Sequence, residues 1–256
     1  MAEKHFYEQK IFSADYLIPF FEKNLPGFKK MKVLEVGCAE GGFLEEMQAQ
    51  GVKITGLELL QSRIDIALKK NPKLNIICGD ITDAHIDKKT GSGFNLIVMR
   101  DTIEHIPDRN ATFSNLHKLL LDDGFLFITF PPRFSAFAGH QQNCKSFIKF
   151  FPYLHYLPAF LLKGIGKVLK EDEKLMAEIA YNYKIGLSIS KFESYYRQFG
   201  FKAVLKDLFF SRPVFKIRYG LKTMRFPNIP VVREFMANGC EYLLQKTGKK
   251  ENDNGI

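Results

Sequence analysis

The chain has 256 residues, of which 46% are hydrophobic and 25% are charged. These proportions exclude wholesale disorder and collagen-like repeats, and the length suits one α/β domain that carries an insertion. The cysteines are far apart and lack the C-x-x-C spacing of zinc and dithiol sites. We expect them to be the reduced, buried thiols of a cytoplasmic protein.

The net charge of +9 is unevenly distributed. Residues 1–132 hold 16 Lys and Arg against 18 Asp and Glu, whereas residues 133–256 hold 21 against 10. A basic surface can serve solubility alone. The basic half is also suited to an anionic ligand, such as a phosphate, a carboxylate or a lipid head group.

No segment is predicted to cross a membrane or to act as a targeting signal. The first ten residues, MAEKHFYEQK, lack the apolar core of a signal peptide. The most apolar stretch, Phe150–Leu162, is interrupted by Pro152 and Pro158 and falls short of the roughly 20 residues that a spanning helix needs. We expect a soluble protein with at most peripheral membrane contact.

Short apolar runs alternate with segments of helical periodicity along the first 132 residues. Strands that are apolar on both faces and separated by helices are typical of a parallel sheet covered on both sides. Two further runs near the other end are expected to join the same sheet. The predicted strands are Met31–Val36, Val52–Glu58, Leu74–Cys78, Phe94–Met99, Phe125–Phe130, Phe201–Leu208 and Cys240–Gln245.

The segment Arg133–Ile189 breaks this alternation and is predicted to contain mostly helices and loops. It has eight Phe and Tyr between residues 134 and 160, together with internal prolines and glycines. These aromatic residues are expected to form a small core of the insertion itself, although an apolar acceptor pocket and a patch that touches a membrane or a partner are alternatives.

Two other helices are predicted from local signals. Ser190 followed by Glu193 predicts a capping box for a helix over residues 191–199, which Gly200 ends. Residues 6–25 have the spacing of an amphipathic helix, which either packs on the sheet or forms a lid over a ligand.

The expected division of the chain follows from these elements. Residues 1–132 and 191–246 form the sheet domain, and residues 133–190 form the insertion. The polar residues 247–256 are expected to be a disordered tail.

The segment Val33–Phe43, VLEVGCAEGGF, follows a strand and opens a helix. Small residues at Gly37, Ala39 and Gly41 allow a tight turn and let a ligand approach the backbone, where free N–H groups at the helix start face it. Such a loop predicts a nucleotide-like ligand, although the pattern by itself also fits a simple strand-to-helix turn.

Two acidic residues are expected at the same edge of the sheet. Glu58 ends the second strand, where its carboxylate can accept two hydrogen bonds from a ribose diol. Asp80 ends the third strand, where it can accept a hydrogen bond from an exocyclic amine while Ile81 contacts the base. Together they favour an adenosine-like ligand.

These residues resemble the motifs of class I S-adenosylmethionine (SAM)-dependent methyltransferases. Val33–Phe43 resembles the glycine-rich first motif, Glu58 the ribose-binding acid and Gly79–Ile81 the adenine-contacting turn. Residues 94–108 resemble the fourth-strand motif of the subgroup that methylates small molecules, with its Glu-His-x-x-Asp pattern. Residues 124–130 are similar to the fifth strand.

The resemblance implies a Rossmann-like α/β fold: a seven-stranded, mostly parallel sheet with helices on both faces and a mainly helical insertion after strand 5 that covers the acceptor site. It implies SAM as cofactor, S-adenosylhomocysteine (SAH) as product, no metal, and in-line methyl transfer to a small-molecule or lipid-like, possibly anionic acceptor. The residues expected to bind the cofactor are Glu35, Gly37, Cys38, Ala39, Gly41, Glu58, Leu59, Asp80, Ile81, Arg100 and Asp101.

Two positions depart from the family pattern. Ala39 replaces the middle glycine of the first motif, a small change that still permits close approach. Arg100 stands where the family more often has a small polar residue, and is either a surface arginine or a group that favours an anionic acceptor. If a hydroxyl acceptor needs a base, His105 and His140 are the candidates.

Three other functions are alternatives. An RNA methyltransferase fits the basic pI, but the fourth strand ends in MRDT rather than the Asn/Asp-Pro-Pro-aromatic motif of enzymes that methylate base amines. A non-catalytic binding module would keep the same loop and acids. An NAD-dependent oxidoreductase is disfavoured, because the loop lacks the G-x-G-x-x-G register and Glu40 would oppose a pyrophosphate.

Overall fold

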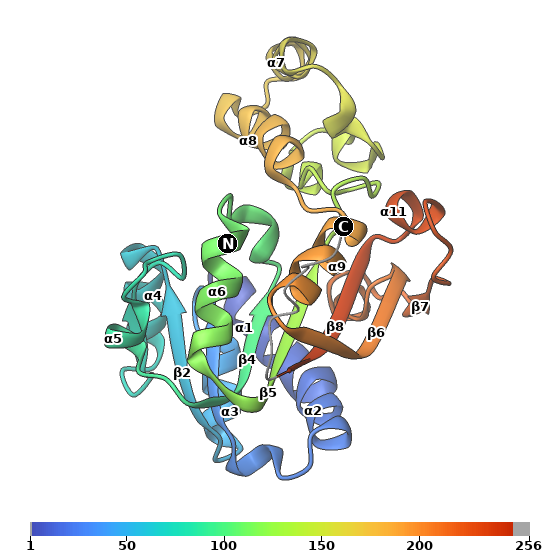
Figure 1. Ribbon diagram of the computed structural model, residues 1–256. Helices are drawn as coiled ribbons and strands as arrows, with labels where there is room; N and C mark the ends of the chain where they lie inside the picture. Colours follow the sequence, from blue (N-terminus) through green and yellow to red (C-terminus); the bar gives the residue numbers. More distant parts are fainter. Residues whose placement is uncertain (1, 248–256) are drawn as a thin grey trace.

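The structure of the protein is a computed structural model that describes residues 2–247. An eight-stranded sheet forms its centre and has helices on both faces (Figure 1). The strands are β1 (Lys32–Val36), β2 (Lys53–Glu58), β3 (Ile76–Cys78), β4 (Phe94–Arg100), β5 (Leu120–Phe130), β6 (Phe201–Ser211), β7 (Met224–Arg225) and β8 (Gly239–Lys246). Their order across the sheet is β3-β2-β1-β4-β5-β8-β6-β7.

The seven predicted strands are confirmed, and β7 is an addition of two residues at the sheet edge, too short to give a periodic signal. Strands β1 to β5 are parallel, and β8 is antiparallel to both β5 and β6. Strand β6 therefore runs in the same direction as β1 to β5. The carboxyl ends of six strands meet at one edge, where ligands bind in open α/β sheets.

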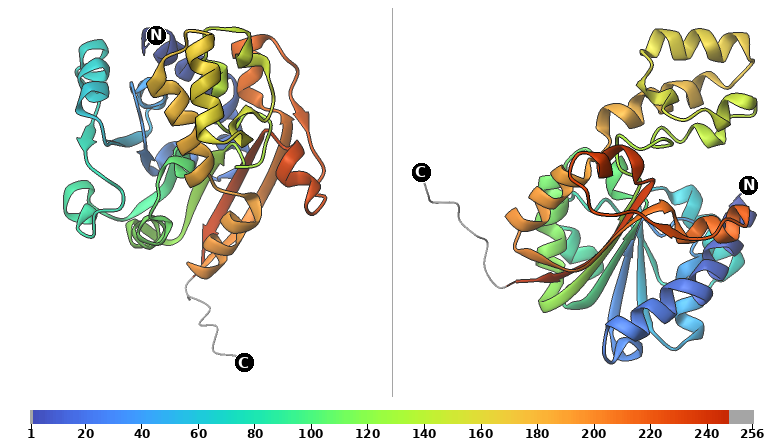
Figure 2. Two further views of the ribbon diagram at one scale, coloured as in Figure 1. Left: turned by 90° about the horizontal axis from the view of Figure 1, so that it is seen from above. Right: turned by 90° about the vertical axis from the view of Figure 1, so that its right-hand side faces the viewer.

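Helices cover the two faces of the sheet with separate hydrophobic cores, and Figure 2 shows both layers in its right-hand view. Helices α6 and α9 pack on one face, and α2 and α3 pack on the other. The helices are α1 (Ala2–Phe12), α2 (Ile18–Asn24), α3 (Gly42–Ala49), α4 (Gln61–Lys70), α5 (Ile86–Thr90), α6 (Arg109–Leu119), α7 (Ala159–Val168), α8 (Glu173–Ile185), α9 (Ile189–Gln198), α10 (Pro213–Tyr219) and α11 (Val232–Met236). Shorter turns are the π-helical η1 (Ser13–Leu17) and the 3₁₀-helices η2 (Phe28–Lys30), η3 (Ile103–His105), η4 (Gln141–Asn143), η5 (Phe147–Phe150) and η6 (Leu154–Tyr156).

The helical N-terminal segment packs on the sheet domain, as one of its two interpretations expected. Leu17 and Phe21 are fully buried beside the sheet. Helix α1 also lies against the start of α3, where Gln9 Oε1 accepts a hydrogen bond from Gly42 N (3.1 Å). A Cβ at position 42 would lie 2.2 Å from the carbonyl oxygen of Phe6, so glycine permits this close approach.

The segment between β5 and α9 is helical, as predicted, and Figures 1 and 2 show it above one end of the sheet. The prediction that its aromatic residues form its core is wrong. The core consists mainly of aliphatic and sulfur-containing side chains, with Leu162 and Ile179 fully buried. Five of its aromatic side chains between residues 134 and 160 are exposed instead: Phe147, Phe150, Phe151, Tyr156 and Phe160. Phe160 is exposed because α7 and α8 pack on each other and leave the outer face of α7 uncovered.

Helix α9 begins two residues earlier than predicted, at Ile189. The expected capping box between Ser190 and Glu193 is wrong, because Ser188 is the N-cap and accepts a hydrogen bond through its own side chain. Glu234 accepts hydrogen bonds from the N–H groups of Ile189 and Ser190 (2.8 Å each). A residue distant in sequence thus satisfies the first turn.

The remaining expectations concern the cysteines, membranes and the tail. All four cysteines, which lie within the described residues, are free thiols, but Cys78 is exposed rather than buried, since β3 is at the sheet edge. None of the helices described between residues 2 and 247 combines the length and apolar character of a bilayer span. The tail expected to be disordered lies, apart from Thr247, outside the described residues.

Glu193 does not cap α9 and is instead the centre of a buried cluster of polar side chains. It accepts hydrogen bonds from Arg233 (3.0 Å), Tyr242 (2.9 Å) and Lys206. Burial acts to raise the pKa of Glu193, but these hydrogen bonds outweigh burial and lower it. The carboxylate therefore holds α9, β6 and β8 together.

We predict that Glu193→Ala lowers the free energy of unfolding by about 3–5 kcal/mol, because it leaves the buried Arg233 without its oppositely charged partner. Chemical denaturation measures this change. Glu178→Ala, at an exposed position of α8, is the control and is expected to change stability by less than about 0.5 kcal/mol. Equal stability of the two variants would contradict the prediction.

Candidate active site

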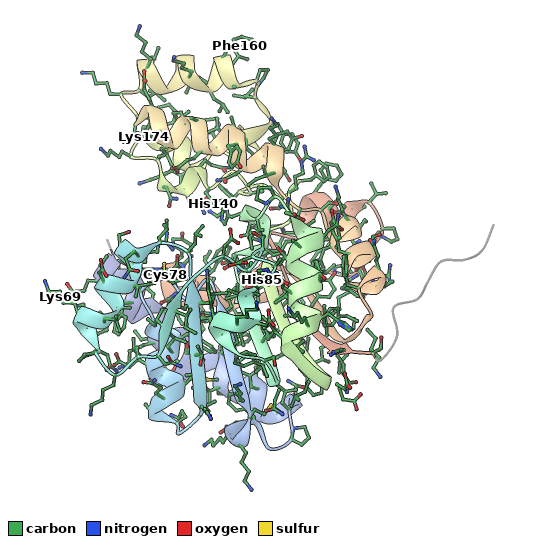
Figure 3. The ribbon with its side chains drawn as sticks, turned by 60° about the vertical axis from the view of Figure 1, so that its left-hand side comes forward. Lys69, Cys78, His85, His140, Phe160 and Lys174 are labelled. Carbon is green, nitrogen blue, oxygen red and sulfur yellow. The ribbon has the colours of Figure 1, made fainter. Side chains whose placement is uncertain are left out.

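A cavity of about 930 Å³ follows the carboxyl edge of the sheet, within the size range of small-molecule sites. Loops after β1, β2, β3 and β4 line it. Helix α1, the segment after β6 and three residues of the insertion, His140, Gln142 and Asn143, line it as well. Figure 3 shows His140 where the insertion meets the sheet domain.

The structure brings together ten of the thirteen residues predicted for the site. The residues that line the cavity are Gly37, Ala39, Glu58, Leu59, Asp80, Ile81, Arg100, Asp101, His105 and His140. Glu35, Cys38 and Gly41 do not line it. Glu35 and Cys38 are buried side chains, and Gly41 faces Leu74.

The glycine loop is held tightly against its neighbours. Gly37 has a φ of +76° and donates its N–H to Leu57 O (2.8 Å). A Cβ there would lie 2.5 Å from Thr102 Oγ1, so a larger residue would displace the loop. Ala39 also has a positive φ, 49°, and keeps its backbone close to the cavity despite its side chain.

Glu58 connects this loop to the end of β2. Its Oε2 accepts a hydrogen bond from Ala39 N (2.9 Å) and its Oε1 accepts one from Leu60 N (3.0 Å). The residue is only 6% exposed but lines the cavity. Because a carboxylate oxygen has two lone pairs, each oxygen keeps one for a ligand hydroxyl.

Asp80 and Ile81 form the turn after β3. Asp80 Oδ1 accepts a hydrogen bond from Thr82 N (2.8 Å), and the residue is exposed. Ile81 is buried, and its carbonyl accepts a hydrogen bond from Asn115 on α6 (2.6 Å). The turn is therefore fixed by its neighbours and presents a carboxylate beside an apolar side chain.

Arg100 is neither a surface arginine nor an unpaired charge. Its guanidinium donates two hydrogen bonds to Glu35 Oε1 (2.5 and 3.2 Å) and lies 4.7 Å from the ring centre of Phe43. Burial raises the pKa of Glu35 although Arg100 acts against it. This ion pair reduces the electrostatic attraction that Arg100 was expected to exert on an anionic acceptor.

Asp101 pairs with Arg212, which the sequence analysis missed. Arg212 directly follows β6 and donates a hydrogen bond to Asp101 Oδ1 (2.5 Å). Burial acts to raise the pKa of Asp101, but Arg212 outweighs burial and lowers it. Arg212 could have been predicted as a site residue if β6 had been known to run parallel to β5, because the end of β6 would then lie at the same edge of the sheet as the other strand ends.

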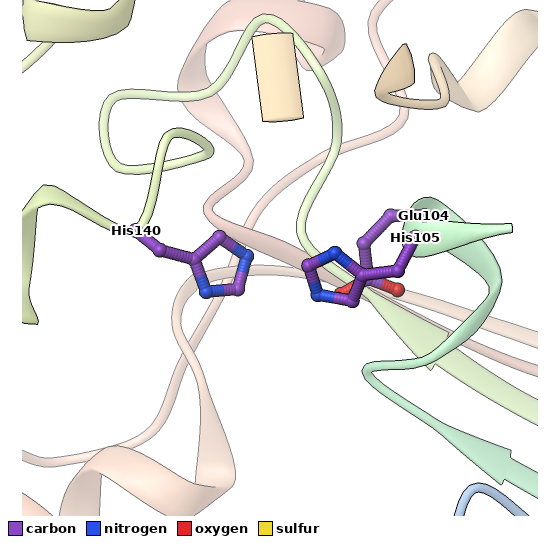
Figure 4. A group of neighbouring side chains, drawn as sticks. All are labelled: Glu104, His105 and His140. Atoms are coloured by element: carbon purple, nitrogen blue, oxygen red, sulfur yellow. The ribbon is translucent and has the colours of Figure 1, made fainter. Parts of the chain in front are cut away.

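Glu104, His105 and His140 lie together, and Figure 4 shows their side chains close to one another, with the two imidazole rings side by side. The ring centres are 5.0 Å apart. Burial lowers the pKa of both histidines, that of His140 to about 4. Burial also raises the pKa of Glu104 well above its ordinary value. Glu104 was part of the quoted motif but not of the predicted site.

Helix α1 adds polar groups from the opposite wall. His5 Nδ1 lies 2.5 Å from Glu40 Oε2, so the helix is bonded to the glycine loop. Lys4, His5, Glu8 and Gln9 all line the cavity. This position covers the end of the loop that was predicted to bind the nucleoside.

The order of strands, the glycine loop after β1 and the acid that ends β2 define the fold of class I SAM-dependent methyltransferases. A family model described as "Methyltransferase domain" matches residues 5–177. The chain belongs to this family. The match agrees with the sequence motifs, which favoured a methyltransferase over an NAD-dependent oxidoreductase.

Individual relatives give the same class. The chain is 31% identical over 140 residues to a ubiquinone biosynthesis O-methyltransferase of Coxiella burnetii, covering 53% of this chain and 55% of the relative. It is 27% identical over 143 residues to the protein of that name from Vibrio atlanticus, covering 54% and 51%. The chain spans about half the length of the curated relatives that it matches.

Solved structures share the fold along nearly the whole chain. An S-adenosylmethionine-dependent methyltransferase from Clostridium acetobutylicum superposes with a TM-score of 0.60 and 11% sequence identity. The superposition covers 93% of this chain and 92% of that chain. At this identity the likeness shows the fold alone.

Glu241 gives the cavity wall a pH-dependent contribution to stability. It lies on β8, is buried, and accepts a hydrogen bond from Tyr16 (2.9 Å). Burial raises the pKa of Glu241 to about 7. Since the folded protein binds this proton more tightly than the unfolded chain, stability is lost as the pH rises from about 4 to about 7.

We predict that Glu241→Gln is equal to the wild type in stability near pH 4 and more stable by up to about 3 kcal/mol at pH 8. Denaturant unfolding across this pH range measures the difference. Glu178→Gln, at an exposed position, is expected to show none. A gap between Glu241→Gln and wild type that stays constant with pH would disprove the assignment.

Proposed function

We propose that the chain is a SAM-dependent O-methyltransferase whose acceptor is a hydroxyl group of a small, lipid-like molecule. The observation that carries this proposal is the continuous cavity that joins two unlike ends. One end has Glu58 and the glycine loop, which suit a nucleoside. The other has His105, His140 and Arg212, which suit a polar acceptor group.

The residues at the first end fit SAM. Glu58 keeps lone pairs for the ribose hydroxyls, and Asp80 beside Ile81 suits the adenine. Oε2 of the buried Glu35 has no hydrogen-bond partner among the described residues, but Glu35 does not line the cavity, so its contact with the cofactor stays a prediction. When bound, SAM supplies an electrophilic methyl group on its sulfonium.

The protein mainly needs to orient the acceptor and exclude water. Orientation alone contributes about 7–11 kcal/mol in well-placed systems. The rigid strand ends fix the nucleoside side, and the helical insertion, which supplies His140, is proposed to cover the acceptor. His105 and His140 are the candidates to receive a hydrogen bond from the acceptor hydroxyl.

Two observations favour a lipid-like acceptor. The relatives named ubiquinone biosynthesis O-methyltransferase point to a hydroxyl on an apolar small molecule. The insertion also exposes Phe150 and Phe160, each 72% accessible, and lysines lie beside both: Lys149 next to Phe150, and Lys163 and Lys167 on α7 with Phe160. Apolar and basic side chains together suit an anionic membrane surface from which such an acceptor is drawn.

The function is tested with methyl-labelled SAM and three acceptor pools: catechols and phenols with isoprenoid or alkyl tails, the same head groups without tails, and total RNA. We expect more label to be incorporated into the tailed compounds than into the tail-free ones, in the form of a methyl ether. Label found in RNA alone would overturn the proposal that the acceptor is a small, lipid-like molecule. SAH binding without any transfer would favour a non-catalytic module.

We predict that Glu58→Ala weakens SAH binding by about 1.5–3 kcal/mol, the worth of hydrogen bonds to a charged group. Titration calorimetry measures the affinity. Glu46→Ala, on the adjacent helix α3 but outside the cavity, is the control. Thermal unfolding of both variants checks that the loop held by Glu58 stays folded, and an unchanged affinity in folded Glu58→Ala would remove this residue from the site.

A further inference from the structure

We propose that Glu104, His105 and His140 form a binding site for a divalent transition-metal ion at the acceptor end of the cavity. The resemblance noted from the sequence implied no metal. The proposal rests on the placement of these three side chains, on their unsatisfied polar atoms and on the chemistry of the donor set.

The three residues come from two parts of the chain. Glu104 and His105 lie on η3, directly after β4, whereas His140 begins η4 in the insertion. One donor atom from each lies within 4.8 Å of the other two. Bonds of about 2.0–2.2 Å to a tetrahedral ion place the ligand atoms roughly 3.4 Å apart. Side-chain rotations that move the donor atoms by about an ångström would therefore complete the site.

The buried polar atoms of this cluster lack the partners that buried groups normally have. Glu104 is 5% exposed, and neither of its carboxylate oxygens has a hydrogen-bond partner among residues 2–247. In the same part of the chain, Nε2 of His140 is buried and unpartnered. Because buried polar groups are nearly always satisfied, such a convergence indicates a missing ligand.

The donor set selects the kind of ion. Two imidazoles and one carboxylate match zinc in open sites and other first-row ions such as cobalt, whereas magnesium prefers oxygen donors alone. Asn182 of α8 lies beside His105, where it can orient the ring as outer partners orient metal-bound histidines. The nearby charge of Arg212 is offset by its pairing with Asp101.

An ion with three protein ligands keeps positions open for other ligands. These positions would face the cavity that His105 and His140 line, where the ion, in place of the two imidazoles, can hold an acceptor oxygen. That role rests on the proposed function, but metal binding does not. The ion would also connect the insertion to the sheet domain, because His140 belongs to one and Glu104 to the other.

The site is tested by titration calorimetry of zinc chloride into untagged, chelator-treated full-length protein. We expect one ion per chain and a rise in melting temperature with zinc, since the ion binds only the folded site. Magnesium chloride is expected to bind more weakly. Glu104→Gln and His140→Asn should each lower the zinc affinity about tenfold or more and abolish the rise in melting temperature.

Matched controls exclude adventitious binding. His85→Asn and Cys78→Ser replace an exposed imidazole and an exposed thiol outside the cluster, and both should bind zinc as the wild type does. Loss of binding in these controls, retention in Glu104→Gln and His140→Asn, or absence of stoichiometric zinc binding by the wild type would each overturn the proposal. Circular dichroism confirms that the variants fold, and the zinc-dependent melting of the wild type remains a test if one does not.

Failure of this site and failure of the proposed function give different results. Zinc bound without methyl transfer to any acceptor would retain the site and reject the function. Methyl transfer that proceeds equally in chelated wild type and in Glu104→Gln, with no zinc binding, would retain the function and reject the site.

Discussion

The carboxylate of Glu58 is the constraint on which the cofactor half of the site depends. It accepts backbone hydrogen bonds from the loop after β1 and from the end of β2, so it sets the distance between the two strand ends. The parallel register of Val36 with Leu57 brings these ends level. A buried acid satisfied by main-chain donors is stable without a basic partner, and its remaining lone pairs face the cavity.

This half of the site could be predicted from the sequence because its determinants are local. A buried parallel strand is a continuous apolar run, and the residue that follows it must lie at the carboxyl edge. Gly37, Glu58 and Asp80 each follow such a run within a few residues. Strand ends therefore fixed their positions before any long-range packing was known.

The other half could not be predicted in this way. Arg212 reaches the cavity because β8, which comes later in the chain, inserts between β5 and β6 and leaves β6 parallel to β5. The same dependence on distant residues explains the misplaced cap of α9, where Glu234 satisfies N–H groups that the local pattern assigned to Ser190. Local capping signals compete with partners that are distant in sequence. Here the buried carboxylates of Glu193 and Glu234 form hydrogen bonds with the distant partners.

The insertion shows a different limit of sequence reasoning. A cluster of aromatic residues indicates apolar surface, but not whether that surface is buried within the segment. Aliphatic side chains fill the space between α7 and α8, and Phe160 remains on the outer face. Since the insertion also contributes His140 to the cavity, one segment carries both an exposed apolar face and a polar group at the proposed acceptor end. Changes in its packing would therefore alter the proposed acceptor half of the site while Glu58 and the glycine loop stay in place, which is the arrangement expected of a fold that keeps one cofactor and varies its acceptor.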